Sequence, residues 1–215
     1  MMSDGSDSSI IPNNNDKASI FDVAIVGGGM AGSIAAFGLA EIGLSVALIE
    51  TKLPESADSS SFDQRSVALS ASSVKILQAL GLWQKVKLLA CPIKKIHVSE
   101  EGQFGFARLD AYSENIDALG QVIPLDSSGP VLWQALKQQG KVTMLCPARV
   151  SQVETDGRIA QLKLNIERDS SAEINTQSEI NSKLVLVADG TYSKITSQLG
   201  INVNRKPYQQ VAVIA

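Results

Sequence analysis

Residues 21–50, FDVAIVGGGMAGSIAAFGLAEIGLSVALIE, constrain the fold of this chain more than any other segment. Residues 23–26 are a short apolar run, which is typical of a strand buried in a parallel sheet. Three glycines follow, a helix is predicted to begin near Met30, and residues 45–49 form a second apolar run. The pattern predicts a strand, a glycine turn, a helix and a second strand. The side chains expected on the buried face of the helix are Ile34, Ala35, Leu39 and Ile42.

Three glycines form the pattern G-x-G-x-x-G, and each has its own mechanical reason. Gly27 lets the chain turn sharply off the strand, and Gly29 leaves room for a pyrophosphate to approach the main chain. Gly32 lets the helix pack close to the sheet. The start of the helix directs free N–H groups and a positive dipole end at the pyrophosphate. The candidate phosphate-binding residues are Gly27, Gly28, Gly29, Met30, Ala31 and Gly32.

Glu50 follows the second predicted strand. A carboxylate at this position accepts hydrogen bonds from the ribose hydroxyls of an adenosine. Its charge would repel a 2′-phosphate, so FAD or NAD fits better than a phosphorylated nicotinamide dinucleotide. The alternative is a glycine-rich turn that packs a helix on a sheet and binds nothing.

The composition of the 215 residues is that of an ordinary globular protein, with 44% hydrophobic and 19% charged residues. The net charge of −3 and the lack of a basic patch give nucleic-acid binding little support. No apolar run approaches the roughly 18 residues of a membrane span. With one histidine and two separated cysteines, Cys91 and Cys146, we expect core thiols, no metal site and a cytoplasmic protein. Residues 1–19 are expected to form a disordered tail without a secretory signal.

The rest of the chain alternates predicted helices and strands. We expect a helix capped by Ser70, Ser72 or Ser73 and ended by Gly81, a helix over residues 131–139, and a short helix before Gly200. Residues 167–182 are expected to be a polar insertion, and residues 211–215 look like a strand cut at its centre, as in a piece of a longer protein. The predicted strands cover residues 93–99, 104–109, 121–125, 142–146, 150–154, 159–166 and 184–188.

Residues 184–193, LVLVADGTYS, resemble the first segment in that an apolar strand is followed by a glycine-containing turn. A buried strand brings Asp189 and Gly190 to its carboxyl end, and ligands of open α/β sheets bind at that edge. An Asp-Gly pair after a strand is by itself usually a turn. In a chain that already carries a dinucleotide motif, it indicates a second part of the same site.

These segments together resemble the flavoprotein aromatic hydroxylases, the class A flavin monooxygenases, from about Val23 to Ala215. The motifs are IVGGGMAG, the LIE strand end, FDQRSVALS, ALGQV and VLVADGTYS, and the HVS and PYQQVAVIA segments point to the ubiquinone-biosynthesis branch. The resemblance implies that NAD(P)H reduces bound FAD and that O2 then forms a flavin C4a-hydroperoxide, which hydroxylates the ring of a polyprenyl phenol.

The resemblance also assigns residues. The glycine loop matches the pyrophosphate loop of the family, Glu50 its ribose acid, and Arg65 an arginine that contacts FAD. Asp189 and Gly190 match the Asp-Gly motif near the pyrophosphate. Where relatives often carry an arginine after that motif, this chain has Lys194, Ile195 and Thr196, and the later Gly-Asp motif of the family does not occur in the 215 residues.

We therefore expect an α/β fold, with a mostly parallel Rossmann-like sheet and the start of a β-rich substrate domain. The FAD/NAD(P)-binding domain is predicted over residues 20–92 and 126–200, and a partial substrate-domain sheet over residues 93–125 and 201–215. Other ubiquinone-biosynthesis proteins and the surface of the inner membrane are expected as further contacts. Three alternatives stay open: another FAD-fold oxidoreductase, an NAD-dependent dehydrogenase, and an inactive fragment or structural subunit.

Overall fold

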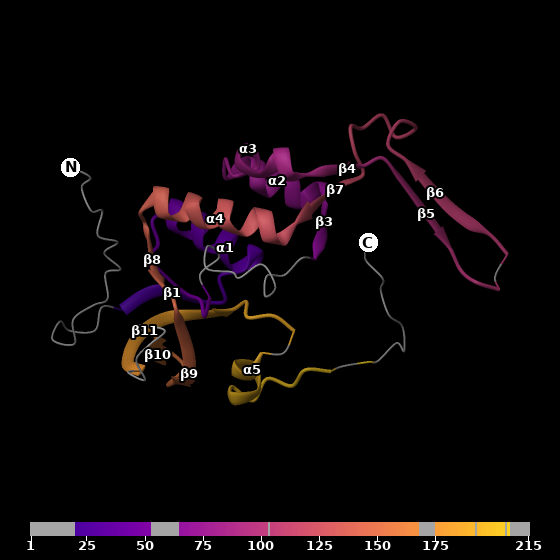
Figure 1. Ribbon diagram of the computed structural model, residues 1–215. Helices are drawn as coiled ribbons and strands as arrows, with labels where there is room; N and C mark the ends of the chain where they lie inside the picture. Colours follow the sequence, from indigo (N-terminus) through magenta and orange to yellow (C-terminus); the bar gives the residue numbers. More distant parts are fainter. Residues whose placement is uncertain are drawn as a thin grey trace, which may run out of the picture. The chain divides into compact units, whose positions relative to one another are not determined.

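The computed structural model describes residues 20–52, 65–102, 104–167, 175–191, 193–204 and 206 (Figure 1). Its chain divides into two compact units. The first unit comprises Met1–Ala57 with Leu136–Gln210, and the second comprises Asp58–Ala135 with Val211–Ala215. This division by contacts leaves the predicted division by function untested. The predicted tail and the predicted strand over residues 211–215 lie outside the described residues.

A six-stranded sheet forms the centre of the first unit, in the order β8-β2-β1-β11-β10-β9. Four neighbouring strands are parallel, as predicted: β8 (Val142–Leu145), β2 (Val46–Ile49), β1 (Ile20–Val26) and β11 (Asn175–Val187). The last two strands, β9 (Ala148–Thr155) and β10 (Ala160–Glu167), are antiparallel and continue the sheet as a meander with β11. The predicted α/β fold is confirmed.

The 13-residue strand β11 joins the two parts of this sheet. Its first half pairs with β10, from Asn175 opposite Glu167 to Ser182 opposite Ala160, and its second half pairs with β1, ending with Val187 opposite Val26. The prediction of a polar insertion over residues 167–182 is therefore wrong for residues 175–182, which belong to β11, and residues 168–174 lie outside the described part of the chain. Its sequence, ERDSSAEINTQSEINS, has few apolar residues, so the alternation that identifies a strand is missing.

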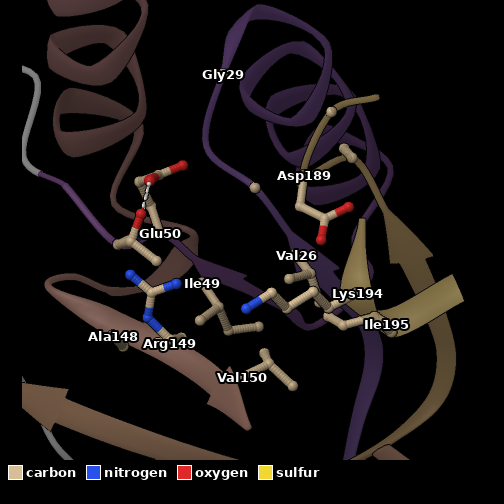
Figure 2. Close-up of a pocket in the computed structure, with 14 residues that line it drawn as sticks. Val26, Gly29, Ile49, Glu50, Ala148, Arg149, Val150, Asp189, Lys194 and Ile195 are labelled. Atoms are coloured by element: carbon tan, nitrogen blue, oxygen red, sulfur yellow. Dashed lines mark hydrogen bonds between the residues drawn. The ribbon is translucent and has the colours of Figure 1, made fainter. Parts of the chain in front are cut away.

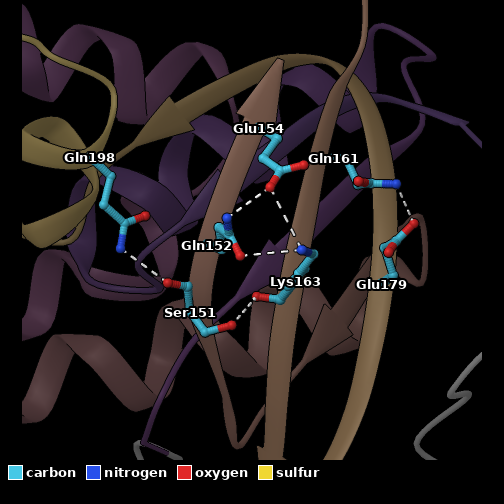
Figure 3. Close-up of polar contacts among 7 residues, drawn as sticks. All are labelled: Ser151, Gln152, Glu154, Gln161, Lys163, Glu179 and Gln198. Atoms are coloured by element: carbon cyan, nitrogen blue, oxygen red, sulfur yellow. Dashed lines mark hydrogen bonds and ion pairs between the residues drawn. The ribbon is translucent and has the colours of Figure 1, made fainter. Parts of the chain in front are cut away.

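The two faces of the parallel strands are covered differently. Ala24, Val26, Ala47 and Ile49 belong to one apolar core with inward residues of the meander such as Leu162 and Leu164. The outward meander residues are polar, and they form the network of Figure 3, in which Lys163 Nζ lies 3.2 Å from Gln152 Oε1 and 3.6 Å from Glu154 Oε1. The meander therefore has one face in the core and one in solvent.

Helix α1 (Met30–Glu41) packs on the opposite face of the parallel strands. Its buried residues are Gly32, Ser33, Ala36 and Ala40, whereas the predicted Ile34, Ala35 and Leu39 are half-buried and Ile42 is 75% exposed. The predicted buried face is therefore wrong. Small side chains face the sheet because they let the helix lie close to it. The prediction selected the larger apolar residues and did not take this close packing into account.

The second unit holds a three-stranded antiparallel sheet in the order β3-β7-β4 and a separate hairpin. The sheet strands are β3 (Ser66–Ser70), β7 (Gly120–Pro124) and β4 (Cys91–Ile93). The hairpin forms from β5 (Lys95–Ser99) and β6 (Phe106–Asp110). The helical segments of this unit are α2 (Ala71–Ala79), α3 (Trp83–Val86) and the 3₁₀ turn η2 (Lys87–Leu89).

Two further helices complete the described chain. Helix α4 (Leu125–Gln139) begins six residues before the predicted start and contains Pro130, because its SSGP segment looks like a loop in sequence. Helix α5 (Lys194–Gln198) is the predicted short helix before Gly200. Of the three serines predicted as possible caps of α2, Ser70 is the one that caps it, by accepting a 3.1 Å hydrogen bond from the N–H of Ser73. Cys91 is exposed, which corrects the expectation of two core thiols.

Candidate functional site

The carboxyl ends of β1, β2 and β11 meet at one edge of the first unit. The N–H of Gly27 donates to the carbonyl of Ile49 (2.9 Å), and the N–H of Ala188 donates to the carbonyl of Val26 (2.7 Å). A pocket of about 400 Å³ lies at this edge, which is where open α/β sheets bind their ligands. Its lining includes Gly27, Gly29, Glu50, Thr51, Arg149, Val150, Asp189, Gly190 and Lys194 (Figure 2).

Gly27 and Gly32 are required by the fold itself. Gly27 has φ of +105°, and a Cβ atom there would lie 2.4 Å from the carbonyl oxygen of Ala188. A Cβ atom on Gly32 would lie 1.9 Å from the carbonyl oxygen of Gly27 and 3.4 Å from Ile25 Cγ2. The predicted mechanical roles of these two glycines, a sharp turn and close helix packing, are therefore confirmed.

Gly29 differs from both of them. Its φ of −64° is open to any residue, and no described atom lies within 4 Å of a Cβ built there, counted beyond its chain neighbours. Gly29 is also the N-cap of α1, and it provides no capping side chain for the first N–H groups of the helix. The fold does not need glycine here, so the open space above the helix start is available to a ligand.

The Glu50 carboxylate ties the glycine loop to the end of β2. Its Oε2 accepts a 2.6 Å hydrogen bond from the N–H of Gly28. Its Oε1 accepts bonds from the N–H (2.6 Å) and hydroxyl (2.9 Å) of Thr51 and from the N–H of Lys52 (3.1 Å). The carboxylate therefore lines the pocket with its position fixed by the main chain on both sides.

Glu50 also determines where β9 begins. Its N–H donates to the carbonyl of Leu145 (3.0 Å), and its own carbonyl accepts from the N–H of Ala148 (2.7 Å). The next residue, Arg149, is exposed and lines the pocket. The sequence reasoning missed Arg149, although it closely follows a predicted parallel strand whose end lies at the same edge of the sheet.

Asp189 and Gly190 reach the pocket from the end of β11, and Gly190 has φ of +92°. Lys194 follows them at the start of α5 and lines the same pocket. The helix is held in place by Gln198, whose Nε2 donates a 3.0 Å bond to the carbonyl of Ser151 (Figure 3). The structure therefore brings Gly27 and Gly29 of the glycine loop together with Glu50 and the Asp-Gly segment around one pocket. The other predicted loop residues, Gly28, Met30, Ala31 and Gly32, are not among those that line it.

A thiol lies beside this carboxylate. Burial, followed by the charge of Glu50, raises the pKa of Cys146 to about 12. The Cys146 side chain therefore stays protonated near neutral pH. A protonated thiol is a poor nucleophile.

Arg65 belongs to the second unit, where it immediately precedes β3. Its carbonyl accepts a 3.0 Å bond from the N–H of Leu125. Its expected contact with FAD stays a prediction.

Comparisons with a family model and with individual relatives point to the same family. A family model described as FAD binding domain matches residues 21–213. The 3-demethoxyubiquinol 3-hydroxylase of Escherichia coli (strain K12) is 33% identical over 196 residues, which are 90% of this chain and 47% of that protein. Ubiquinone hydroxylase UbiL of Rhodospirillum rubrum is 28% identical over 91% of this chain and 43% of its own length. The chain thus spans about half the length of these relatives.

Solved structures share the fold at lower identity. The p-nitrophenol 4-monooxygenase PnpA from Pseudomonas putida DLL-E4 superposes with a TM-score of 0.68 at 18% identity, over 86% of this chain and 44% of that chain. The flavin-dependent monooxygenase PieE, solved with FAD and substrate, superposes with a TM-score of 0.67 at 21% identity, over 85% of this chain and 32% of its own.

Among the helices of the described residues, none has the length and apolar character of a membrane span.

Proposed function

Because the chain belongs to the FAD-binding domain family, we propose that the pocket at the carboxyl edge of its sheet binds the ADP half of FAD. The observation that carries this proposal is the contrast among the three glycines. Two are required by neighbouring atoms of the protein, whereas Gly29 faces open space at a helix start. A ligand that needs close approach to the main chain accounts for the third glycine.

The residues of the pocket fit this cofactor. The N-terminal N–H groups of α1 would face the diphosphate, and the Glu50 carboxylate would accept hydrogen bonds from the adenosine ribose. Glu50 and Asp189 bring two negative charges to the pocket, and Arg149 and Lys194 bring two positive charges. The basic pair offsets the repulsion that the two acids would exert on a diphosphate.

We further propose that the chain is the FAD-binding part of a monooxygenase that hydroxylates the ring of a polyprenyl phenol in ubiquinone biosynthesis, with NAD(P)H and O2. Support comes from the two ubiquinone-pathway hydroxylases named above, each of which matches about nine-tenths of the chain. When bound, FAD supplies the electron transfer and the oxygen activation. The pocket residues would orient the cofactor and hold its adenosine end.

The test is a titration of the purified chain with FAD, followed by flavin absorbance and fluorescence, with NAD as the competing dinucleotide. Saturable FAD binding that is lost in Gly29→Val supports the proposal. Tight binding of NAD in preference to FAD would point to the dehydrogenase alternative.

The proposed reaction is tested with the same protein. FAD, NADH or NADPH, and a short-chain prenyl phenol are added, and the hydroxylated product is sought by mass spectrometry. FAD binding without product would restrict this chain to the binding role.

A further inference from the structure

Arg149 is a pocket residue whose position follows from the main chain around Glu50. Ala148 is fixed by its 2.7 Å bond to the Glu50 carbonyl, and its side chain is buried in the core between the sheet and the meander. Successive side chains of a strand point to opposite faces, so Arg149 points away from that core. Figure 2 shows its guanidinium group on the Glu50 side of the pocket.

The order of the strands gives the direction in which an adenine would extend. A diphosphate at the glycine loop lies at the end of β1, and the ribose acid Glu50 lies at the end of β2. The next strand in the sheet is β8, and the chain continues from Leu145 directly to the Cys146–Arg149 segment. Because phosphate and base leave a ribose at opposite ends, the adenine extends toward Arg149.

Among the residues that the structure describes, no ion pair or side-chain hydrogen bond engages the guanidinium of Arg149. This sets it apart from Lys163, which contacts Glu154, and from Lys183, which lies 2.7 Å from Asp22 Oδ1. A planar guanidinium can lie flat on an aromatic ring and attract it through a cation–π interaction.

We propose that Arg149 is a binding residue for the adenine ring, stacking its guanidinium on the base while Glu50 holds the ribose. This inference rests on the proposed FAD site and extends it with a specificity-determining residue. The inference places the adenine ring beside the segment that follows β8. It also requires the effect of Arg149 to depend on the adenine portion of the ligand.

The experiment compares the full chain with Arg149→Ala, Arg149→Lys and Arg149→Tyr. Affinities for FAD, for ADP and for FMN, which has no adenine, are measured by fluorescence and calorimetry. Arg158→Ala is the matched control, because Arg158 is exposed at the β9–β10 turn and does not line the pocket. Circular dichroism and melting temperature show whether each variant is folded.

We expect Arg149→Ala to bind FAD and ADP about tenfold more weakly, with any affinity for FMN unchanged. Arg149→Lys should stay weak because an ammonium has no planar face, and Arg149→Tyr should recover most of the affinity. If Arg149→Ala binds FAD and ADP as tightly as the unaltered chain, the inference is wrong while the proposed function stands. Full rescue by lysine would show that charge alone acts, which also overturns stacking. If the unaltered chain binds neither FAD nor ADP, the proposed site fails and this inference fails with it.

Discussion

The carboxylate of Glu50 accepts a 2.6 Å hydrogen bond from the main-chain N–H of Gly28, which connects the end of β2 to the glycine loop after β1. The proposed ribose acid is therefore also a structural residue in the protein without ligand. It joins two parallel strands at their carboxyl ends and holds the loop in the shape that faces the pocket. Binding of a ribose would add to these contacts or replace some of them.

Replacing Glu50 by alanine should therefore lower both stability and FAD affinity. The change leaves the N–H groups of Gly28 and Thr51 without their acceptor, and the loss of a hydrogen bond to a charged group costs about 1.5–3 kcal/mol. Urea unfolding measures the loss of stability, and Glu114→Ala, an exposed acid of the second unit, is the control. An unchanged unfolding midpoint would show that the Glu50 contacts contribute nothing to the fold.

Gly27 and Gly29 should separate folding from binding. Gly27→Ala forces a Cβ atom to 2.4 Å from the Ala188 carbonyl oxygen at a positive φ, so we expect a loss of several kcal/mol or failure to fold. Gly29→Ala meets no described atom within 4 Å and should melt within a few degrees of the unaltered chain. Its FAD affinity should nevertheless fall at least about tenfold, because the new methyl group occupies the space of the pyrophosphate. Thermal melts and FAD titrations of both variants check this contrast.

Asp22 should make stability depend on pH in the acid range. A hydrogen bond from Lys183, followed by bonds from Ser45, lowers the pKa of Asp22 from 3.8 to about 2. Because the folded-state pKa is depressed, the stabilisation is complete above pH 3.8 and is lost as the pH falls toward 2.

The measurement compares urea unfolding of the unaltered chain and of Asp22→Asn between pH 7 and pH 2. The unaltered chain should be more stable at pH 7, and the difference should shrink across the stated window. A difference that stays constant down to pH 2 would contradict the assigned pKa shift.

The two cysteines should react with iodoacetamide at very different rates. Cys91 is exposed, whereas burial and then the Glu50 charge raise the pKa of Cys146 to about 12. Only the thiolate is nucleophilic, so at pH 8 one thiol should be modified quickly and the other slowly. Mass spectrometry of the unaltered chain and of Cys91→Ser follows the two reactions. Rapid labelling that persists in folded Cys91→Ser would show that Cys146 is accessible and ionised.

Local sequence was sufficient for the parts of the site that are consecutive in the chain. The run from β1 through α1 to β2 was predictable because a buried apolar run and glycines at fixed spacing each leave a local signal. The same holds for the strand that delivers Asp189 and Gly190. Two of the three glycine roles follow from main-chain geometry alone, and the structure confirms them.

Tertiary structure decided what depends on partners distant in the chain. The buried face of α1 consists of Gly32, Ser33, Ala36 and Ala40 because close packing on the sheet selects small side chains over hydrophobic ones. The first half of β11 is a strand because β10 pairs with it, although its own residues lack alternation. Arg149 reaches the pocket because the Glu50 main chain fixes the start of β9. Local patterns in the chain were thus enough to predict the fold class and the glycine loop beside the pocket. The packing of the sheet decided which other side chains surround it, because that choice depends on pairing between segments about 100 residues apart.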